Sequence, residues 1–259
     1  SRIRFLMEAR SNPPIVAVTG AGSGIGAATA ERFAREGWDL ILIGRRQEAL
    51  ERTRLQIERS TPGRKAHPLA LDIGAHDCGD RASQWLGAHP ELSARLSCVV
   101  HNAGMFQRTT TLATSDGDWH LMFETNVFGV MRLNAAFWNA LKANRGSVVT
   151  VSSTLGLRPT PDTAAYSASK AALVNWTQSF AVEAAPFGVR VNCVCPGLVD
   201  TPIHDFKTQA DRDRLGPIQP LGRIGKPEEI AHMIYTLAGP GSEWTTGAIV
   251  SVDGGIGLV

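Results

Sequence analysis

Tyr166 and Lys170 stand four residues apart in a helix-compatible stretch, and together they could move a proton. On a helix, residues at this spacing share one face, with about 5–6 Å between their Cβ atoms. A free phenol has a pKa of about 10, so acid–base work near neutral pH needs a fall of about 3 units, or about 4 kcal/mol. A cation about 4 Å away at an effective dielectric constant of about 20 supplies that much. The pair is therefore predicted to act as general acid/base (Tyr166) and pKa-lowering cation (Lys170).

The same spacing also occurs in ordinary helices, so its meaning depends on the rest of the chain. The chain has 259 residues, 43% of them hydrophobic, and a net charge of +2. That is enough for one large α/β domain, and the dispersed basic residues do not favour a nucleic-acid partner. The four cysteines form no CxxC pair and the seven histidines are scattered, so we expect reduced thiols and no metal site. Without an N-terminal apolar signal or an 18-residue apolar run, a cytoplasmic protein with no membrane partner is expected.

A glycine-rich turn near the N-terminus predicts a phosphate-binding unit. The apolar run 15–19 fits a buried strand, the turn 20–26 follows it, and a helical pattern continues to Glu36. Phosphate groups bind where a strand passes through such a turn into a helix. Gly20 permits the tight turn and Gly26 allows the helix to lie close to the strand. Many loops are rich in glycine for conformational reasons alone, but the position between strand and helix favours a dinucleotide.

The second predicted strand, 39–43, ends at a glycine followed by Arg45 and Arg46. In a βαβ unit this position meets the adenosine ribose, where an acidic residue would accept hydrogen bonds from the hydroxyl groups. Two arginines instead favour a 2′-phosphate. They could also be the solvated start of the charged helix 47–59.

The strand–helix alternation continues along the chain. Further strands are predicted at 67–71, 97–101, 147–151 and 189–194, with helical patterns to about Gly87 and over 118–143. Alternation of this kind predicts a doubly wound parallel sheet of Rossmann type with about seven strands, an α/β fold. Ligands of such sheets bind at the carboxyl ends of the strands, where Asp72, Asn102 and Ser153 stand.

With these residues in view, the chain resembles the compact, single-domain branch of the short-chain dehydrogenase/reductases. The turn from Thr19 to Gly26 matches the TGxxxGxG motif, His101 to Gly104 matches NNAG, and Tyr166 to Lys170 matches YxxxK. Ser153 stands thirteen residues before the tyrosine, as in the family. The match covers about residues 14 to 257, and His101 departs from it by replacing the first asparagine of NNAG.

The resemblance implies a role for each catalytic residue. Ser153 would polarise the substrate oxygen and Tyr166 would pass the proton. Lys170 would lower the tyrosine pKa and bind the nicotinamide ribose, and Asn126, in a distorted helix turn, would support a water that continues the proton relay. Without a catalytic role, Asn126 would be an ordinary buried asparagine of a helix, and Ser153 an ordinary hydroxyl at the end of a strand.

The resemblance also implies the cofactor contacts. NADP is expected, and NAD less so, because Gly44 replaces the aspartate of NAD-preferring relatives and Arg45 follows it, although Ser23 is not the second cation that many NADP-preferring relatives carry. The residues expected to bind the cofactor lie at the strand ends and are Gly20, Ser23, Gly24, Ile25, Gly26, Arg45, Arg46, Asp72, Ile73, Asn102, Ala103, Gly104, Tyr166, Lys170, Pro196, Gly197, Val199 and Thr201.

Hydride transfer through such a site interconverts a secondary alcohol and a ketone. We expect one domain over 14–259 after a tail at 1–13, with residues 155–164 and a lid at about 198–225, including Phe206, around a small carbonyl or alcohol substrate. Aromatic residues on the two long helices, such as Trp138 and Trp176, together with the family's habit, predict a homotetramer.

Three alternatives remain open from the sequence. One is a 3-oxoacyl-carrier-protein reductase, although Val182 and Phe187 stand where those enzymes present arginines. The second is an NAD-dependent polyol or hydroxysteroid dehydrogenase. The third is a non-catalytic NADP(H)-binding regulator, which would be expected to lack one of the catalytic residues.

Overall fold

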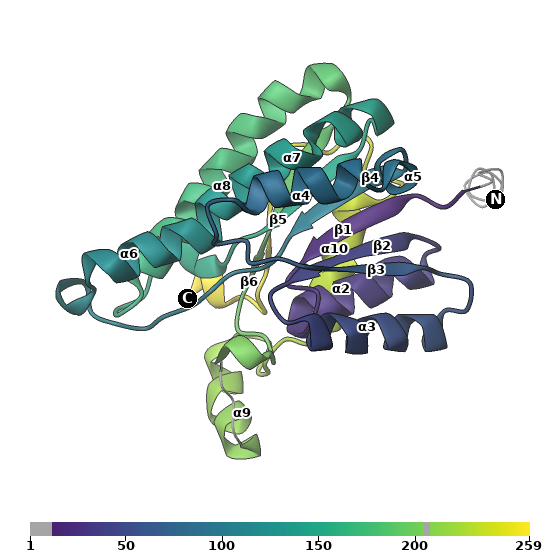
Figure 1. Ribbon diagram of the computed structural model, residues 1–259. Helices are drawn as coiled ribbons and strands as arrows, with labels where there is room; N and C mark the ends of the chain where they lie inside the picture. Colours follow the sequence, from purple (N-terminus) through teal and green to yellow (C-terminus); the bar gives the residue numbers. More distant parts are fainter. Residues whose placement is uncertain (1–11, 205–207) are drawn as a thin grey trace.

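The computed structural model describes residues 12–204 and 208–259. Their seven strands form one parallel sheet in the order β3-β2-β1-β4-β5-β6-β7 (Figure 1). The strands are β1 Ile15–Thr19, β2 Asp39–Gly44, β3 Ala66–Ala70, β4 Leu96–His101, β5 Ser147–Val151, β6 Arg190–Pro196 and β7 Ile249–Val252. This confirms the predicted Rossmann-type α/β fold.

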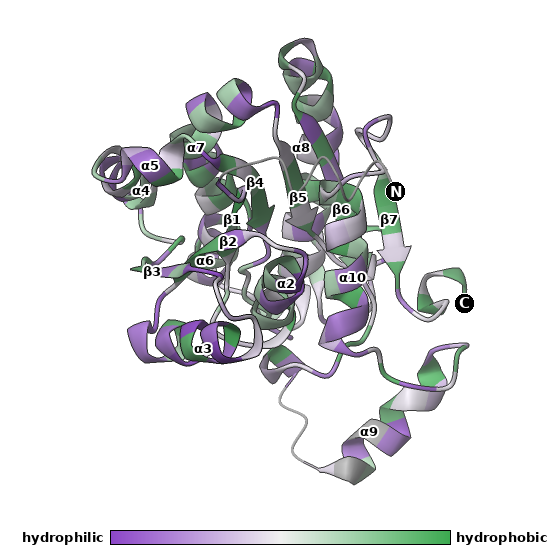
Figure 2. Ribbon diagram, turned by 90° about the vertical axis from the view of Figure 1, so that its right-hand side faces the viewer, coloured by the Kyte–Doolittle hydropathy of each residue, from purple (hydrophilic) through white to green (hydrophobic). Residues whose placement is uncertain are grey.

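Helices cover both faces of the sheet, because the central strands are apolar on both sides. On one face lie α2 Gly24–Arg35, α3 Gln47–Ser60 and α10 Pro227–Ala238, and on the other lie α4 Cys78–Gly87, α7 Gly129–Asn144 and α8 Ala164–Ala184. The hydropathy colouring of Figure 2 shows apolar central strands between these layers. All five residues of β1 are buried. None of the described helices is long and apolar enough to span a bilayer.

The structure shifts several predicted boundaries. The third strand begins one residue earlier than predicted, and the sixth extends to Pro196. The helix predicted over 118–143 is interrupted: α6 Asp116–Phe123 passes through one π-helical turn, Glu124–Phe128, into α7. A π turn contains one extra residue per hydrogen-bonded ring, which lets a side chain leave the regular helical positions.

The segment predicted as a substrate lid contains three short helical pieces: 3₁₀ turns at Pro202–His204 and Gly216–Ile218, with α9 Gln209–Leu215 between them. In Figures 1 and 2, α9 projects away from the sheet body. Phe206 and residues 1–11 of the predicted tail lie outside the described residues. The division into a tail at 1–13 and one domain over 14–259 stays a prediction. The short helix α5 Pro90–Ser93 leads into β4.

Candidate active site

A cavity of about 1120 Å³ opens at the carboxyl edge of the sheet and is lined by residues that follow each of the seven strands. All but two of the predicted site residues line it. The exceptions are Gly26, which packs behind the glycine turn, and Asn126, which is fully buried. The parallel topology therefore brings to one cavity predicted site residues from Gly20 to Thr201, which lie 181 positions apart in the chain.

The glycine turn is shaped by close contact with the loop after β4. Gly20 has a left-handed backbone (φ 69°), and a Cβ atom there would lie 2.8 Å from Asn102 Nδ2. A Cβ atom at Gly26 would lie 2.2 Å from the carbonyl oxygen of Gly20. Asn102 Nδ2 donates to the Thr19 carbonyl at 2.9 Å, which fixes one turn against the other. Bare backbone therefore faces the cavity beside the start of α2, which fits a pyrophosphate.

The ribose end of the cavity has cations and no carboxylate at the end of β2. Arg45 and Arg46 are exposed and line the cavity directly after Gly44. Among the described residues, neither forms an ion pair within 4.0 Å. Asp72, which follows β3, is the acidic residue among the described lining residues. This arrangement fits a phosphorylated ribose.

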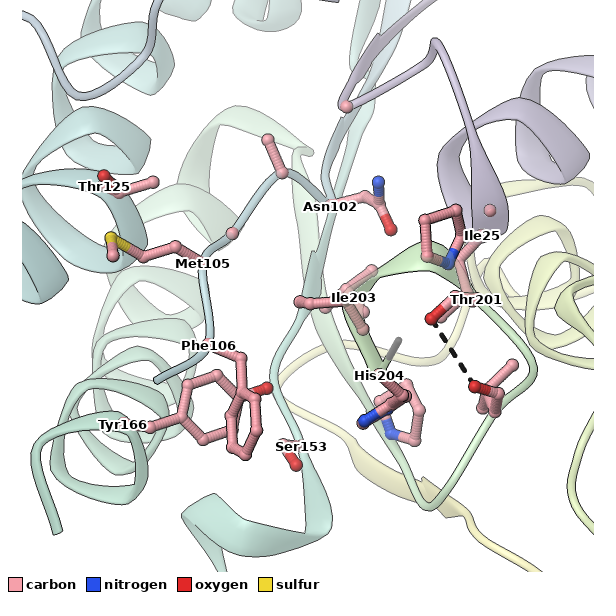
Figure 3. A pocket seen from close by; sticks show the side chains of 18 of the residues that line it. Ile25, Asn102, Met105, Phe106, Thr125, Ser153, Tyr166, Thr201, Ile203 and His204 are labelled. Atoms are coloured by element: carbon pink, nitrogen blue, oxygen red, sulfur yellow. Dashed lines mark hydrogen bonds between the residues drawn. The ribbon is translucent and has the colours of Figure 1, made fainter. Parts of the chain in front are cut away.

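Ser153 and Tyr166 lie near each other in the cavity (Figure 3), which Lys170 also lines. Tyr166 lies in the first turn of α8 and Lys170 one turn later, and both are buried. Lys170 Nζ donates to the Val151 carbonyl at 2.9 Å. Ser153 follows β5, and its hydroxyl accepts a hydrogen bond from the Leu155 amide at 3.1 Å. The helix thus presents phenol and ammonium beside a hydroxyl held by the neighbouring strand.

Burial shifts the pKa values of Tyr166 and Lys170 in opposite directions. Burial raises the pKa of Tyr166 to about 12, although a hydrogen bond with Ser153 opposes the rise. Burial lowers the pKa of Lys170 to about 8. Lys170 Nζ lies 5.8 Å from the centre of the tyrosine ring and bonds to a carbonyl group instead. Desolvation of the phenol is the largest influence on its pKa, and the lowering by Lys170 stays a prediction.

The π turn places Asn126 between two parts of the site. Its Oδ1 accepts from the Met105 amide at 2.8 Å, and its Nδ2 donates to the Met105 carbonyl at 3.0 Å and to Ser169 Oγ at 3.0 Å. A Cβ atom at Gly104 would lie 3.1 Å from Asn126 Oδ1 and 3.2 Å from Lys170 Nζ. Asn126 therefore clamps the loop after β4 to α8 and borders the same small space as the lysine.

The sequence reasoning missed two residues at the substrate end, Phe106 and Arg108, whereas His204 belongs to the segment predicted as a lid. The ring of Phe106 packs edge-on against the ring of Tyr166, with 4.9 Å between the ring centroids. The ring of His204 lies 6.0 Å from the ring of Phe106. Arg108 lines the cavity two residues further along. Phe106 and Arg108 could have been found, because they follow the NAG turn at the end of a parallel strand. The position of His204 depends on the tertiary structure.

His101, the departure from the NNAG pattern, is buried at the end of β4. Neither ring nitrogen has a hydrogen-bond partner in the structure, and the same holds for Oδ1 of Asn134 on α7. Burial lowers the pKa of His101 to about 4, so the ring is neutral at pH 7. The asparagine retained from the motif, Asn102, is the one that fixes the glycine turn.

Comparison with known proteins decides the family. A family model described as enoyl-(acyl carrier protein) reductase matches residues 20–257. The chain belongs to the short-chain dehydrogenase/reductase family. It is 35% identical to cyclopentanol dehydrogenase from Comamonas sp. over 253 residues, covering 95% of this chain and 98% of that protein. It is 33% identical to a 3-oxoacyl-acyl-carrier-protein reductase from Thermotoga maritima over 240 residues, covering 92% and 96%.

Solved structures of the short-chain dehydrogenase/reductase family agree in fold. The 3-ketoacyl-acyl-carrier-protein reductase of Brucella melitensis, complexed with NADH, superposes with a TM-score of 0.84 at 27% identity, covering 95% of this chain and 99% of that one. L-sorbose reductase of Gluconobacter frateurii, complexed with NADPH and L-sorbose, gives 0.88 at 25% identity, covering 95% and 97%. The protein is thus an oxidoreductase that acts on alcohol and ketone groups.

Proposed function

We propose that the protein is an NADP(H)-dependent reductase and dehydrogenase that interconverts a ketone and a secondary alcohol, with Tyr166 as general acid/base. The observation that supports this most strongly is the meeting of Ser153, Tyr166 and Lys170 at one end of a cavity whose other end is bare glycine backbone and two arginines. No other described part of the chain places a titratable hydroxyl, a buried ammonium group and a phosphate-binding turn around one space.

The bound dinucleotide would supply the hydride. The glycine turn, Asn102 and Thr201 would hold it on one side of the cavity, with Ile73 beside the adenine ring. In the reductive direction, Tyr166 donates its proton to the carbonyl oxygen while the Ser153 hydroxyl donates a hydrogen bond to the same oxygen. A phenol that keeps its proton is suited to this step, and burial favours the protonated form.

Lys170 and Asn126 are placed to return a proton to the tyrosine. Lys170 has a pKa of about 8, so near neutral pH it exchanges protons without a large free-energy cost. Asn126 borders the same space and fixes the loop that closes it. In this proposal the lysine serves as the proton source behind Tyr166, which is the relay role that the resemblance implies.

The experiment is a panel of ketones and secondary alcohols tested with NADPH and NADH on the wild type and on Tyr166→Phe. We expect turnover by the wild type and a loss of kcat of at least about 1000-fold in the variant, because only the transferred proton is removed. Cofactor binding, followed by fluorescence titration, should change little. Retention of more than about a tenth of kcat would refute the assignment of Tyr166.

Preference for NADP over NAD rests on Arg45 and Arg46. One charge-assisted hydrogen bond contributes about 1.5–3 kcal/mol, which corresponds to a preference of about 10- to 100-fold. The relatives in complex with NADH and with NADPH show that the family accepts both. Arg45→Ala should lower kcat/KM with NADPH selectively, and Arg59→Ala, an exposed arginine that does not line the cavity, is the matched control. Equal kcat/KM values for the two cofactors in the wild type would contradict the preference.

The alternative of a carrier-protein reductase draws support from relatives of that name. Against it, the end of α8 and the following turn expose Val182 (76%) and Phe187 (50%) where an acidic carrier would need cations. Activity on a 3-oxoacyl carrier protein well above that on the same acyl group without the carrier would favour this alternative. A preference for NADH would favour the alternative of a polyol or hydroxysteroid dehydrogenase. Binding of NADPH without turnover of any substrate would favour a non-catalytic regulator.

We also propose that α7 and α8 pair with a second subunit, in a homotetramer. On their outer surface Trp176 stacks on Phe180 with 5.1 Å between rings, and Trp138 contacts both Phe180 and Phe187. Phe187 is exposed and the other three rings are partly exposed, and aromatic surface of this kind is typical of subunit contacts. A monomer at micromolar concentration by light scattering would contradict the proposal. The cytoplasmic location stays a prediction.

A further inference from the structure

The charged side chains of the cavity are unevenly distributed. Arg45, Arg46 and Asp72 stand at the cofactor end, and Lys170 lies buried beside the tyrosine. At the substrate end the described lining residues include one exposed cation, Arg108, and no carboxylate. His204 lines the same end, and burial lowers its pKa, so it adds no charge at neutral pH.

Arg108 is oriented toward the cavity by the loop that follows the NAG turn. Phe106 and Arg108 both line the cavity, whereas Gln107 between them does not and instead donates to Asp118 Oδ1 at 3.4 Å. This alternation is that of an extended segment, in which residues two apart share one side. The Thr109 amide donates to the Asp162 carbonyl at 2.9 Å, which ties the far end of the segment to the loop before α8.

The guanidinium group of Arg108 has no ion-pair partner within 4.0 Å among residues 12–204 and 208–259. Other arginines of the described chain show how readily such partners form: Arg54 and Arg132 each hold a glutamate at 2.6 Å. A cation at a cavity mouth with no protein carboxylate beside it attracts an anionic ligand.

We infer that the substrate is an oxo acid, whose anionic group binds Arg108 while its carbonyl oxygen meets Ser153 and Tyr166. This rests on the proposed alcohol/ketone chemistry and adds the substrate class to it. Phe106 stands two residues before Arg108, lines the same cavity and packs against Tyr166 with 4.9 Å between ring centroids, so we expect the body of the substrate that joins carbonyl and anion to be apolar. On an extended segment the Cα atoms of Phe106 and Arg108 stand up to about 7 Å apart, so we expect an anion bound by Arg108 to be separated from the carbonyl group and not adjacent to it.

Four probes test this inference: 4-acetylbenzoate, its uncharged analogue 4-methylacetophenone, 4-acetylphenyl phosphate, and phenylglyoxylate, whose carboxylate adjoins the carbonyl. In the wild type with NADPH, kcat/KM for 4-acetylbenzoate should exceed that for 4-methylacetophenone by about fivefold, the upper range for a solvent-exposed ion pair. Phenylglyoxylate should show no such advantage. The phosphate probe shows whether a carboxylate or a phosphate is preferred, and either preference supports the inference.

Variants assign the effect to the arginine. Arg108→Gln should bring the ratio of acid to uncharged ketone to about one, Arg108→Lys should retain part of it, and Arg81→Gln, an exposed arginine on α4, should leave the ratio unchanged. Binding of 4-acetylbenzoate to the NADP⁺ complex, measured by calorimetry, gives a readout that does not need turnover. It should weaken in Arg108→Gln and not in Arg81→Gln.

Different experimental results would overturn the oxo-acid inference and the proposed function. If the wild type reduces 4-methylacetophenone as well as 4-acetylbenzoate, and Arg108→Gln binds 4-acetylbenzoate as tightly as the wild type does, the oxo-acid inference is overturned and the proposed chemistry stands. If the acid binds through Arg108 but Tyr166→Phe retains its kcat, the catalytic assignment is overturned and the binding site stands.

Discussion

At the amino edge of the sheet the buried carboxylate of Asp39 is matched by cations, whereas at the carboxyl edge the buried ammonium group of Lys170 bonds to a neutral carbonyl. Asp39 Oδ2 accepts from Arg95 Nη1 at 2.9 Å, and its Oδ1 accepts from the Lys65 amide at 3.0 Å. Lys170 Nζ donates to the Val151 carbonyl at 2.9 Å. Both side chains are almost fully buried, at 3% and 4% exposure.

The two buried charges differ in how far their partners offset the free-energy cost of desolvation. An ion pair with further hydrogen bonds offsets much of the desolvation of Asp39, and breaking it would leave a charge uncompensated. A lone carbonyl offsets less, so the pKa of Lys170 falls to about 8. We therefore expect the ion pair of Asp39 and Arg95 at the amino edge to stabilise the fold. We expect Lys170 at the carboxyl edge to destabilise the fold while serving the chemistry of the site.

The largest expected effect comes from Lys170→Met. We expect kcat to fall by at least about 100-fold, since the proton source of Tyr166 is removed. The free energy of unfolding at pH 7 should rise by up to about 3 kcal/mol, because an ammonium group is no longer desolvated. Urea denaturation and steady-state kinetics measure the two effects, with Lys65→Met, an exposed lysine, as control.

The same comparison fixes the sign of a pH effect. The folded pKa of Lys170, about 8, lies below the ordinary value of 10.5, so between these pH values the unfolded chain binds more protons. The wild type should therefore gain stability, relative to Lys170→Met, as the pH rises from about 8 to 10.5. A variant that is less stable than the wild type at pH 7 would contradict the view that the lysine is destabilising.

At the amino edge, Asp39→Asn should lower the free energy of unfolding by about 2–4 kcal/mol, because Arg95 keeps a partly buried charge without its carboxylate. The side chain lies at the edge opposite the cavity, so kcat of the folded fraction should stay within about twofold of the wild type. Chemical denaturation at pH 7 measures the loss, with Glu58→Gln on α3 as a control for an exposed ion pair. A loss below about 1 kcal/mol would mean that the two edges do not differ as described.

The smallest expected effect is a change in the ultraviolet absorbance of the two tyrosines with pH. Burial raises the pKa of both tyrosines, Tyr166 and Tyr235, to about 12. Without added cofactor, the folded protein should therefore show almost no phenolate absorbance up to about pH 11, and each tyrosine favours the native state less as the pH rises from about 10 to 12. Ultraviolet difference spectra of the wild type and Tyr166→Phe measure this. A tyrosine that ionises near pH 7 would confirm the prediction that Lys170 lowers its pKa.

The sequence by itself determined the architecture and most of the residues that line the cavity. Apolar runs alternating with helical patterns permit little besides a parallel sheet, and parallel strands end at one edge, so the glycine turn, Asn102 and Ser153 had to share a site. The spacing of Tyr166 and Lys170 places them on one helix face in any α-helix.

The tertiary structure decided what depends on contacts between distant segments. The interruption of the long helix at Glu124–Phe128 accompanies bonds from Asn126 to Met105, which local propensity does not encode. The hydrogen bond from the Thr109 amide to the Asp162 carbonyl, which ties the segment after Arg108 to the loop before α8, likewise joins residues far apart in the sequence. The direction of the Tyr166 pKa shift was decided in the same way: sequence spacing gives the distance to a possible cation, but desolvation depends on all the segments that surround the phenol, and here it is the larger effect.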